Sequence, residues 1–309
     1  AYDEFYGRSW LLFHYLQLSG KRRGQYSQYR LALANGATEL DAATTVFGDL
    51  KLLEKELNAY QQQKRMSYLP IAADKLKVGA ITVRKMRAAE AAMMPVILES
   101  KRGVDDEMAK ALLPRAQAIA VTYPDDPAVL AALAEAEHDA GNFTVAVAAA
   151  DKALASSPEL VNAHVQKIFA LSRIAEDSEQ PETAWKLVRK AVTALNKFKM
   201  DQPIPLIYYY RSIRASGKDL TETAIHGLER ALQLAPYDQN VRWQVVQQLV
   251  EEEKYPTAHR TLMPLANDPH NRGDDNPAIA LLADIKVKWD AKLAELEAAK
   301  PKVPPPPTK

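Results

Sequence analysis

Two stretches of the chain follow one template. Residues 127–158 read PAVLAALAEAEHDAGNFTVAVAAADKALASSP, and residues 205–236 read PLIYYYRSIRASGKDLTETAIHGLERALQLAP. Each opens at a proline, has a glycine in its middle (Gly141, Gly217), and closes with Ala-Leu and a terminal proline. Small residues recur at matching steps, first Ala146 and Ala224, then Ala153 and Ala231. Because helices that lie close together need small side chains at the contact, and proline ends a helix, the template predicts stacked pairs of helices.

Weaker copies of this pattern flank the two stretches. We expect further helix pairs over 85–122, 160–198 and 239–268, with Gly103 breaking the first, and a last helix over about 275–299 that closes the stack. In the second helix of the 160–198 pair we expect these side chains to face inward: Trp185, Leu187, Val188, Val192 and Leu195. In the 239–268 pair the expected inward set is Trp243, Val246, Val250, Ala258, Leu262 and Leu265, with Pro264 disturbing the second helix.

The first part of the chain predicts a different, compact unit of four short helices. We expect helices over 3–18 and 25–34, a third capped by Thr38, and a fourth that Gly48-Asp49 caps and that runs to about Arg65. The broad apolar side of the first comprises Trp10, Leu11, Leu12, Tyr15, Leu16 and Leu18. The predicted organisation is a small helical unit at 1–65, a connector at 66–84, a helical repeat array at 85–300 and a disordered proline-rich tail at 301–309.

The composition excludes several classes of function. The 309 residues carry a formal net charge of +1, which does not indicate a large basic field for nucleic acid. Cysteine is absent, so the chain has no disulfide, thiolate zinc site or cysteine nucleophile. No apolar run is long enough to span a bilayer and no signal peptide is evident. Because the chain begins at alanine, we expect a processed product or an excised piece of a longer protein.

The two stretches resemble tetratricopeptide repeats, in which small residues and a terminal proline recur over about thirty-four residues. Laid on one another without a gap, they pair Leu130 with Tyr208, Leu133 with Arg211, Ala134 with Ser212, and Pro158 with Pro236. Arg211 departs from the leucine of the family, and Glu137 and Ala215 replace its helix A tyrosine. The resemblance covers roughly residues 85–270. It implies an all-α fold, a right-handed α-α superhelix of about five helix pairs preceded by the small helical unit.

The first unit resembles something else. YGRSWLLFHYL and AATTVFGDLKLLEKELNAY are similar to the C-terminal helices of gluzincin metallopeptidases of the peptidase MA group, where a tyrosine at the place of Tyr6 stabilises the oxyanion in related aminopeptidases. Gluzincins bind zinc through a helical H-E-x-x-H, and no two of the six histidines here have that spacing. We therefore interpret Tyr6 as a packed tyrosine and expect this chain alone to be inert, with any catalytic half upstream of Ala1.

The other candidate sites in the sequence do not indicate a catalytic function. His14 lies within an apolar helix, so we interpret it as a core or boundary histidine. His138 and Asp139 are neighbours that point about a hundred degrees apart on a helix, so we expect a solvated helix end rather than a catalytic pair. No phosphate-binding glycine loop and no G-x-S-x-G elbow occurs. The sequence predicts no catalytic residue, metal or cofactor.

The tetratricopeptide resemblance implies a groove lined by the first helix of each pair. In that family its second, fifth, sixth, ninth and twelfth-to-thirteenth positions face a peptide. Here these become Asn162, Val165, Gln166, Phe169 and Arg173; Tyr209, Tyr210 and Ile213; and Asn240, Trp243, Gln244 and Gln247. Amides bond an extended backbone and aromatic rings anchor side chains. The alternative is that Phe169, Tyr209 and Trp243 fill packing between repeats. The family's Lys–Asn carboxylate clamp is not evident, so a free C-terminal carboxylate ligand is not implied.

Three functions remain open. The first is a non-catalytic scaffold that binds a peptide or partner protein in the groove, without nucleic acid or membrane insertion. The second is the substrate-recruiting C-terminal part of a zinc metallopeptidase, and the third is a purely structural role in a larger assembly. Because peptidase-like proteins of this group are often exported bacterial proteins, we expect a periplasmic or cell-envelope location, with the cytoplasm as the alternative. The sequence does not identify the partner or the oligomeric state.

Overall fold

The computed structural model describes residues 2–35, 37–268, 270–271 and 275–299. Within these ranges the secondary structure consists of fifteen α-helices and one 3₁₀ turn, without a β-strand. The all-α prediction is confirmed. Contacts divide the chain into two units, residues 1–83 and 84–309. The proline-rich tail predicted at 301–309 lies outside the described residues.

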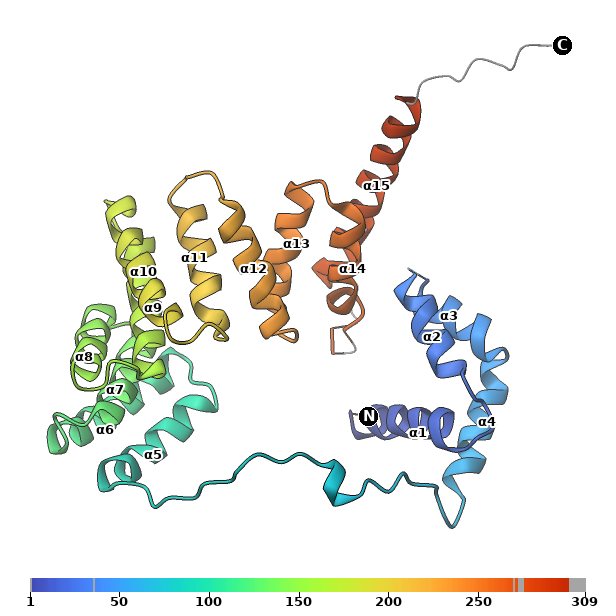
Figure 1. The fold of residues 1–309 in the computed structure, drawn as a ribbon, viewed down its shortest axis with the longest axis horizontal. Helices are drawn as coiled ribbons and strands as arrows, with labels where there is room; N and C mark the ends of the chain where they lie inside the picture. The colour runs from blue at the N-terminus through green and yellow to red at the C-terminus, as the bar shows by residue number, and fades with distance from the viewer. Residues whose placement is uncertain (1, 36, 269, 272–274, 300–309) are drawn as a thin grey trace. The chain divides into compact units, whose positions relative to one another are not determined.

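The first unit is built from four short helices. They are α1 (Tyr2–Leu18), α2 (Gln25–Ala34), α3 (Glu39–Phe47) and α4 (Leu50–Gln61), shown in Figure 1. Thr38 and Asp49 cap α3 and α4 as predicted, because each side chain accepts a hydrogen bond from a backbone N–H of the first turn. The fourth helix ends at Gln61, earlier than the predicted Arg65.

A half-buried polar cluster links α1, α4 and the turn before α2. Glu56 Oε2 on α4 accepts hydrogen bonds from Tyr15 Oη on α1 at 3.0 Å and from Arg22 Nε in the turn at 2.6 Å. Trp10 was predicted on the packed side of α1, and this was wrong, since its side chain is 55% exposed and rests on the His14 ring at 4.8 Å. The neighbouring helices cover the part of the apolar side that holds Leu11, Tyr15 and Leu16.

Between α4 and α5 the chain has one 3₁₀ turn, Ala73–Lys75. The side chains of residues 67–87 are all exposed.

The second unit is a row of helix pairs followed by one further helix, which confirms the predicted α-α superhelix (Figure 1). The pairs are α5 (Ala88–Lys101) with α6 (Asp106–Thr122), α7 (Pro127–Asp139) with α8 (Phe143–Ser156), α9 (Val161–Glu176) with α10 (Pro181–Asn196), α11 (Pro203–Ala215) with α12 (Glu222–Leu234), and α13 (Gln239–Glu251) with α14 (Tyr255–Ala266); α15 (Pro277–Ala298) follows. We call the first helix of each pair helix A and the second helix B.

Small residues form the contacts between these helices, as the template predicts. Ala153 on α8 has no exposed surface and packs against Leu130 and Ala131 of α7 and Ala163 of α9. Four more template residues are fully buried: Ala134, Ala146, Ala224 and Ala231. The B helices α8 and α12 therefore lie close to their neighbours because alanine occupies the contacts.

When the two stretches are aligned without a gap, helix B matches but helix A is shifted by two residues. α7 and α11 each have 13 residues and begin at a proline, and a glycine with positive φ stands two residues after each end, Gly141 at 84° and Gly217 at 67°. The loop at 216–221 is longer than the loop at 140–142, so the extra residues shift helix A while helix B keeps its register. Arg211 is therefore equivalent to Glu135 rather than to Leu133.

Two further expectations for the array were wrong. Leu187 on α10 is 51% exposed, because it points away from Trp185 and Val188, which are buried as predicted. Pro264 does not disturb the second helix of its pair, since α14 continues through it to Ala266. It stands in the last turn, with its ring exposed.

Candidate interaction surface

A chain of side-chain contacts crosses four consecutive A helices of the array. The His138 ring on α7 lies 5.9 Å from the Phe169 ring on α9, and Phe169 lies 5.3 Å from Tyr208 on α11. The Arg211 guanidinium is 5.1 Å from the Tyr208 ring centroid, and Arg211 Nε donates to Gln244 Oε1 on α13 at 2.9 Å. We call the surface formed by these five residues with Arg173 and Gln247 the A-helix face.

The larger part of the A-helix face surrounds an open pocket of about 350 Å³. It is lined by Glu176, Trp185, Tyr208, Tyr210, Arg211, Arg214, Ala215, Gln244 and Gln247. Burial raises the pKa of Tyr208, and Arg211 opposes that shift. The pocket thus joins aromatic walls to cationic and amide groups, which is the mixture that ligand-binding hollows commonly show.

Two of the ionic groups in this pocket are already neutralised. Glu176 accepts from Arg173 at 2.7 Å, and both nitrogens of the Arg214 fork donate to Glu251. The Arg214 hydrogen bonds hold the pKa of Glu251 below its ordinary value. Arg211 is the pocket cation that has no carboxylate partner within the described part of the chain, and its contacts are with the neutral side chains of Gln244 and Tyr208.

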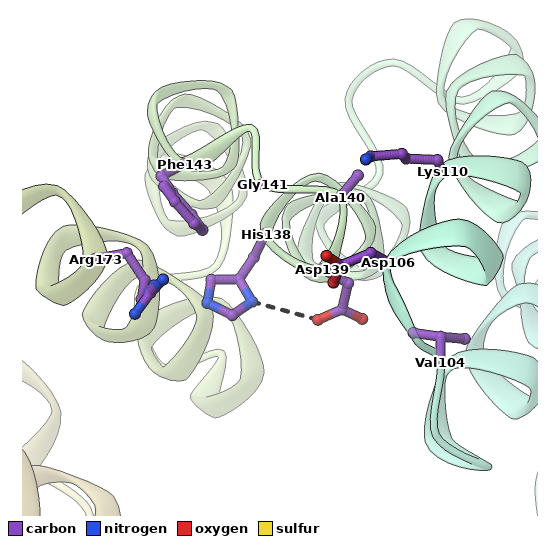
Figure 2. A pocket seen from close by; sticks show the side chains of 9 residues that line it. All are labelled: Val104, Asp106, Lys110, His138, Asp139, Ala140, Gly141, Phe143 and Arg173. Atoms are coloured by element: carbon purple, nitrogen blue, oxygen red, sulfur yellow. Dashed lines mark hydrogen bonds and ion pairs between the residues drawn. The ribbon is translucent and has the colours of Figure 1, made fainter.

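A second pocket of about 450 Å³ lies where the A-helix face meets the ends of α7 and α9. Figure 2 shows His138 and Arg173 turned toward it near Phe143, with the Arg173 guanidinium 5.6 Å from the Phe143 ring centroid. His138 Nδ1 and Asp139 Oδ1 are 3.3 Å apart and both side chains are half-buried, so the expectation of diverging side chains at a solvated helix end was wrong. Two carboxylates and two cations share the lining (Asp106, Asp139, Lys110, Arg173), so this pocket has no single charge preference.

The residues predicted for the groove divide between surface and core. Phe169, Arg173, Gln244 and Gln247 lie at the pockets or in the contact chain described above. Asn240 is exposed, and Tyr209 and Trp243 are partly buried against the core of the array. Gln166 and Ile213 are at most 8% exposed, so their side chains do not offer a surface to a partner. Tyr210 is 3% exposed and forms part of the pocket wall.

Several of the predicted amides bond to this chain itself. Asn162 Nδ2 donates to Glu135 Oε2 at 3.4 Å, and Gln166 Nε2 donates to Asn162 Oδ1 at 3.5 Å. Gln244 Nε2 donates to the Asn240 backbone oxygen at 3.0 Å. Of the amides in the predicted set, the exposed Gln247 is the one with an open side chain at a pocket.

Sequence reasoning missed Tyr208, Arg211 and Arg214. Counted from Pro203, where α11 begins, the sixth, ninth and twelfth residues are these three. Pro203 at the helix start and the matching glycines Gly141 and Gly217 carry the register, and they could have revealed it.

His14 and His164 form contacts with groups of their own unit. Tyr60 Oη and His14 Nδ1 are 2.9 Å apart, and His164 Nε2 is 2.8 Å from the Pro158 backbone oxygen. Tyr6 meets the Phe5 ring edge to face at 5.4 Å, but it is 47% exposed, so the expectation that it is packed was wrong. Across the described ranges, no group of three or more His, Asp or Glu side chains is placed to hold a metal ion. Nor is any described helix long and apolar enough to cross a bilayer.

Comparison with known proteins gives likenesses of fold only. No family model matches the chain, and no curated protein matches it. A thermophilic TPR protein of Thermus thermophilus, TTC0263, is 14% identical, with a TM-score of 0.49 over 67% of this chain and 100% of that one. MamA from residue 41 onward of Desulfovibrio magneticus RS-1 is 18% identical, with a TM-score of 0.44 over 57% and 91%. The MamA RS-1 ArsTM double mutant is 17% identical, with a TM-score of 0.45 over 60% and 97%.

Proposed function

We propose that this protein is a non-catalytic interaction scaffold that binds an extended peptide segment of a partner protein along the A-helix face. The observation that carries the proposal is the continuous contact chain from His138 through Phe169 and Tyr208 to Arg211 and Gln244. Because these side chains hold one another in place, the face is preorganised, which lowers the entropy cost of binding. Flat aromatic rings beside polar groups are typical of residues that anchor a partner.

The proposal is tested with peptides selected from a random library on the immobilised full chain. We expect the selected peptides to lose at least about ten-fold in affinity on Phe169→Ala and on Gln247→Ala, as judged by fluorescence anisotropy. Leu187→Ala is the matched control, because Leu187 is an exposed apolar side chain on helix B of the α9–α10 pair. A library that yields no binder, or binders that lose equally on the control, contradicts the proposal.

A second proposal is that this chain is the C-terminal part of a zinc metallopeptidase, with its repeats recruiting substrates. The resemblance of the sequence of the first unit to the C-terminal helices of gluzincin peptidases supports it. That role requires an H-E-x-x-H helix encoded upstream of Ala1, so the complete reading frame tests it. The same likeness supports a periplasmic or cell-envelope location over a cytoplasmic one. Cell fractionation with an antibody to the chain tests the location.

A further inference from the structure

Arg211 holds an unusual place on the A-helix face. It occupies the position in α11 that Glu135 occupies in α7, and Glu135 is an ion-pair partner of Lys101. The two neighbouring arginines of Arg211 have carboxylate partners: Arg173 pairs with Glu176, and Arg214 pairs with Glu251. Within the described residues, no carboxylate forms an ion pair with Arg211. A half-buried guanidinium without a counter-charge is a cost to the fold unless a ligand supplies one.

The Arg211 side chain is held in a fixed orientation. Its Nε donates to Gln244 Oε1 at 2.9 Å, while its guanidinium stands 5.1 Å from the Tyr208 ring centroid. Nε is engaged by Gln244, and the Tyr208 hydroxyl accepts a hydrogen bond from Arg211 as well. The two terminal nitrogens together carry four N–H groups, so donors remain at the pocket. A planar guanidinium edge matches the two oxygens of a carboxylate, and it does so at little further entropy cost when it is already oriented.

The walls of the pocket favour an ionic contact there. Trp185, Tyr208 and Ala215 line it beside Arg211, and Trp185 and Tyr210 are buried. Because part of the pocket wall is apolar, a charge pair beside it is less screened by water than one on a flat polar surface. Gln247 lies at the same pocket with an exposed amide that can bond a peptide backbone.

We infer that Arg211 binds the side-chain carboxylate of an aspartate or glutamate within an extended partner peptide, which gives the A-helix face its sequence preference. The inference rests on the proposed function. It names an internal acidic residue as the ligand group. An apolar residue beside that acid would meet the ring of Tyr208.

The test uses a random peptide library fused to a carrier through its C-terminus, so that no peptide has a free terminal carboxylate. It is selected in parallel on the full chain and on the variants Arg211→Gln and Arg211→Leu. We expect selection on the wild type to enrich an acidic residue at one position of the peptide, and selection on both variants to lose that enrichment. Arg230→Gln is the matched control, because Arg230 is an exposed arginine on α12 that bonds Gln233, away from the pocket.

Affinities of one selected peptide then identify the ligand group. With an amidated C-terminus, replacing its glutamate by glutamine is expected to weaken binding to wild type about ten-fold or more, and to change binding to Arg211→Gln little. A glutamine peptide with a free C-terminal carboxylate is expected to stay weak. If the glutamine peptide with the free C-terminal carboxylate recovers the affinity, Arg211 binds the terminal carboxylate of a chain and the inference fails.

The failure of the inference and of the proposed function are distinguishable. Equal acidic enrichment on wild type and on both Arg211 variants, or no acidic preference on wild type, overturns the role of Arg211. If the same peptides still lose affinity on Phe169→Ala and Gln247→Ala, the proposed function stands. Circular dichroism of each variant checks that the fold is retained, and two different replacements of Arg211 guard against a defect of one of them.

Discussion

Enlarging Ala153 tests whether close helix contacts hold the array together. This side chain has no exposed surface and lies between α7 and α9, against Leu130, Ala131 and Ala163. A leucine there has no room in the present packing, so α8 must move away or adopt strained rotamers. Overpacking of this kind costs about 1–3 kcal/mol. We therefore expect Ala153→Leu to lower the free energy of unfolding by that amount.

The matched control is Ala148→Leu on the same helix, at an exposed position. Both changes replace alanine by leucine within α8, so the difference in helix propensity is common to them. We expect the control to change stability by less than about 0.5 kcal/mol. Urea unfolding followed by circular dichroism at 25 °C measures both. Equal effects of the two variants would refute the close contact at Ala153.

Three further predictions concern single sites. Gly217→Ala is expected to destabilise the protein by about 1 kcal/mol in urea unfolding. The space around a Cβ there is open but φ is 67°, so the cost comes from the backbone conformation. Gly79→Ala is the control, with open space and no positive φ, and is expected to be near neutral. Tyr210→Phe removes the 2.8 Å donor to Gln248 Oε1, and leaving that buried amide unbonded is expected to cost about 1–3 kcal/mol in the same assay. Arg84 and the Arg87 backbone hold the pKa of Glu90 at about 2 against an ordinary 4.5, so its stabilising effect is present above pH 4.5 and is lost as pH falls toward 2. The difference in melting temperature between wild type and Glu90→Gln is therefore expected to shrink from pH 7 to pH 3, and a constant difference would contradict this.

Helix ends could be predicted from the sequence where a capping residue, a proline or a glycine stands at the boundary. Thr38 and Asp49 offer side-chain oxygens to the first turn of a helix, and proline or glycine stands at most boundaries of the array. The buried alanines were predictable for a similar reason, because a recurring small residue in a helix signals a close neighbour. These signals are local, so the sequence alone carries them.

The register of α11 and the contents of the groove were harder to predict. The loop at 216–221 holds extra residues, and nothing in the sequence of helix B reveals them. An alignment without a gap therefore predicted Tyr210 at the surface and did not predict Arg211 there. Trp10 and Leu187 belong to apolar sides that are wider than the surface their neighbours cover. Asn162 bonds Glu135, a residue on another helix, and such a partner is set by packing rather than by spacing.

Site-specific cross-linking tests the role of the A-helix face most directly. The chain has no cysteine, so a single cysteine carrying a photoactivatable cross-linker can be placed at Gln247 on the face or at Gln233 on α12. Both positions are exposed. With a peptide selected on the full chain, we expect a cross-linked product from Gln247→Cys that excess unlabelled peptide abolishes, and none from Gln233→Cys. Competed cross-linking at Gln233 alone, or at both sites equally, would contradict binding on the A-helix face.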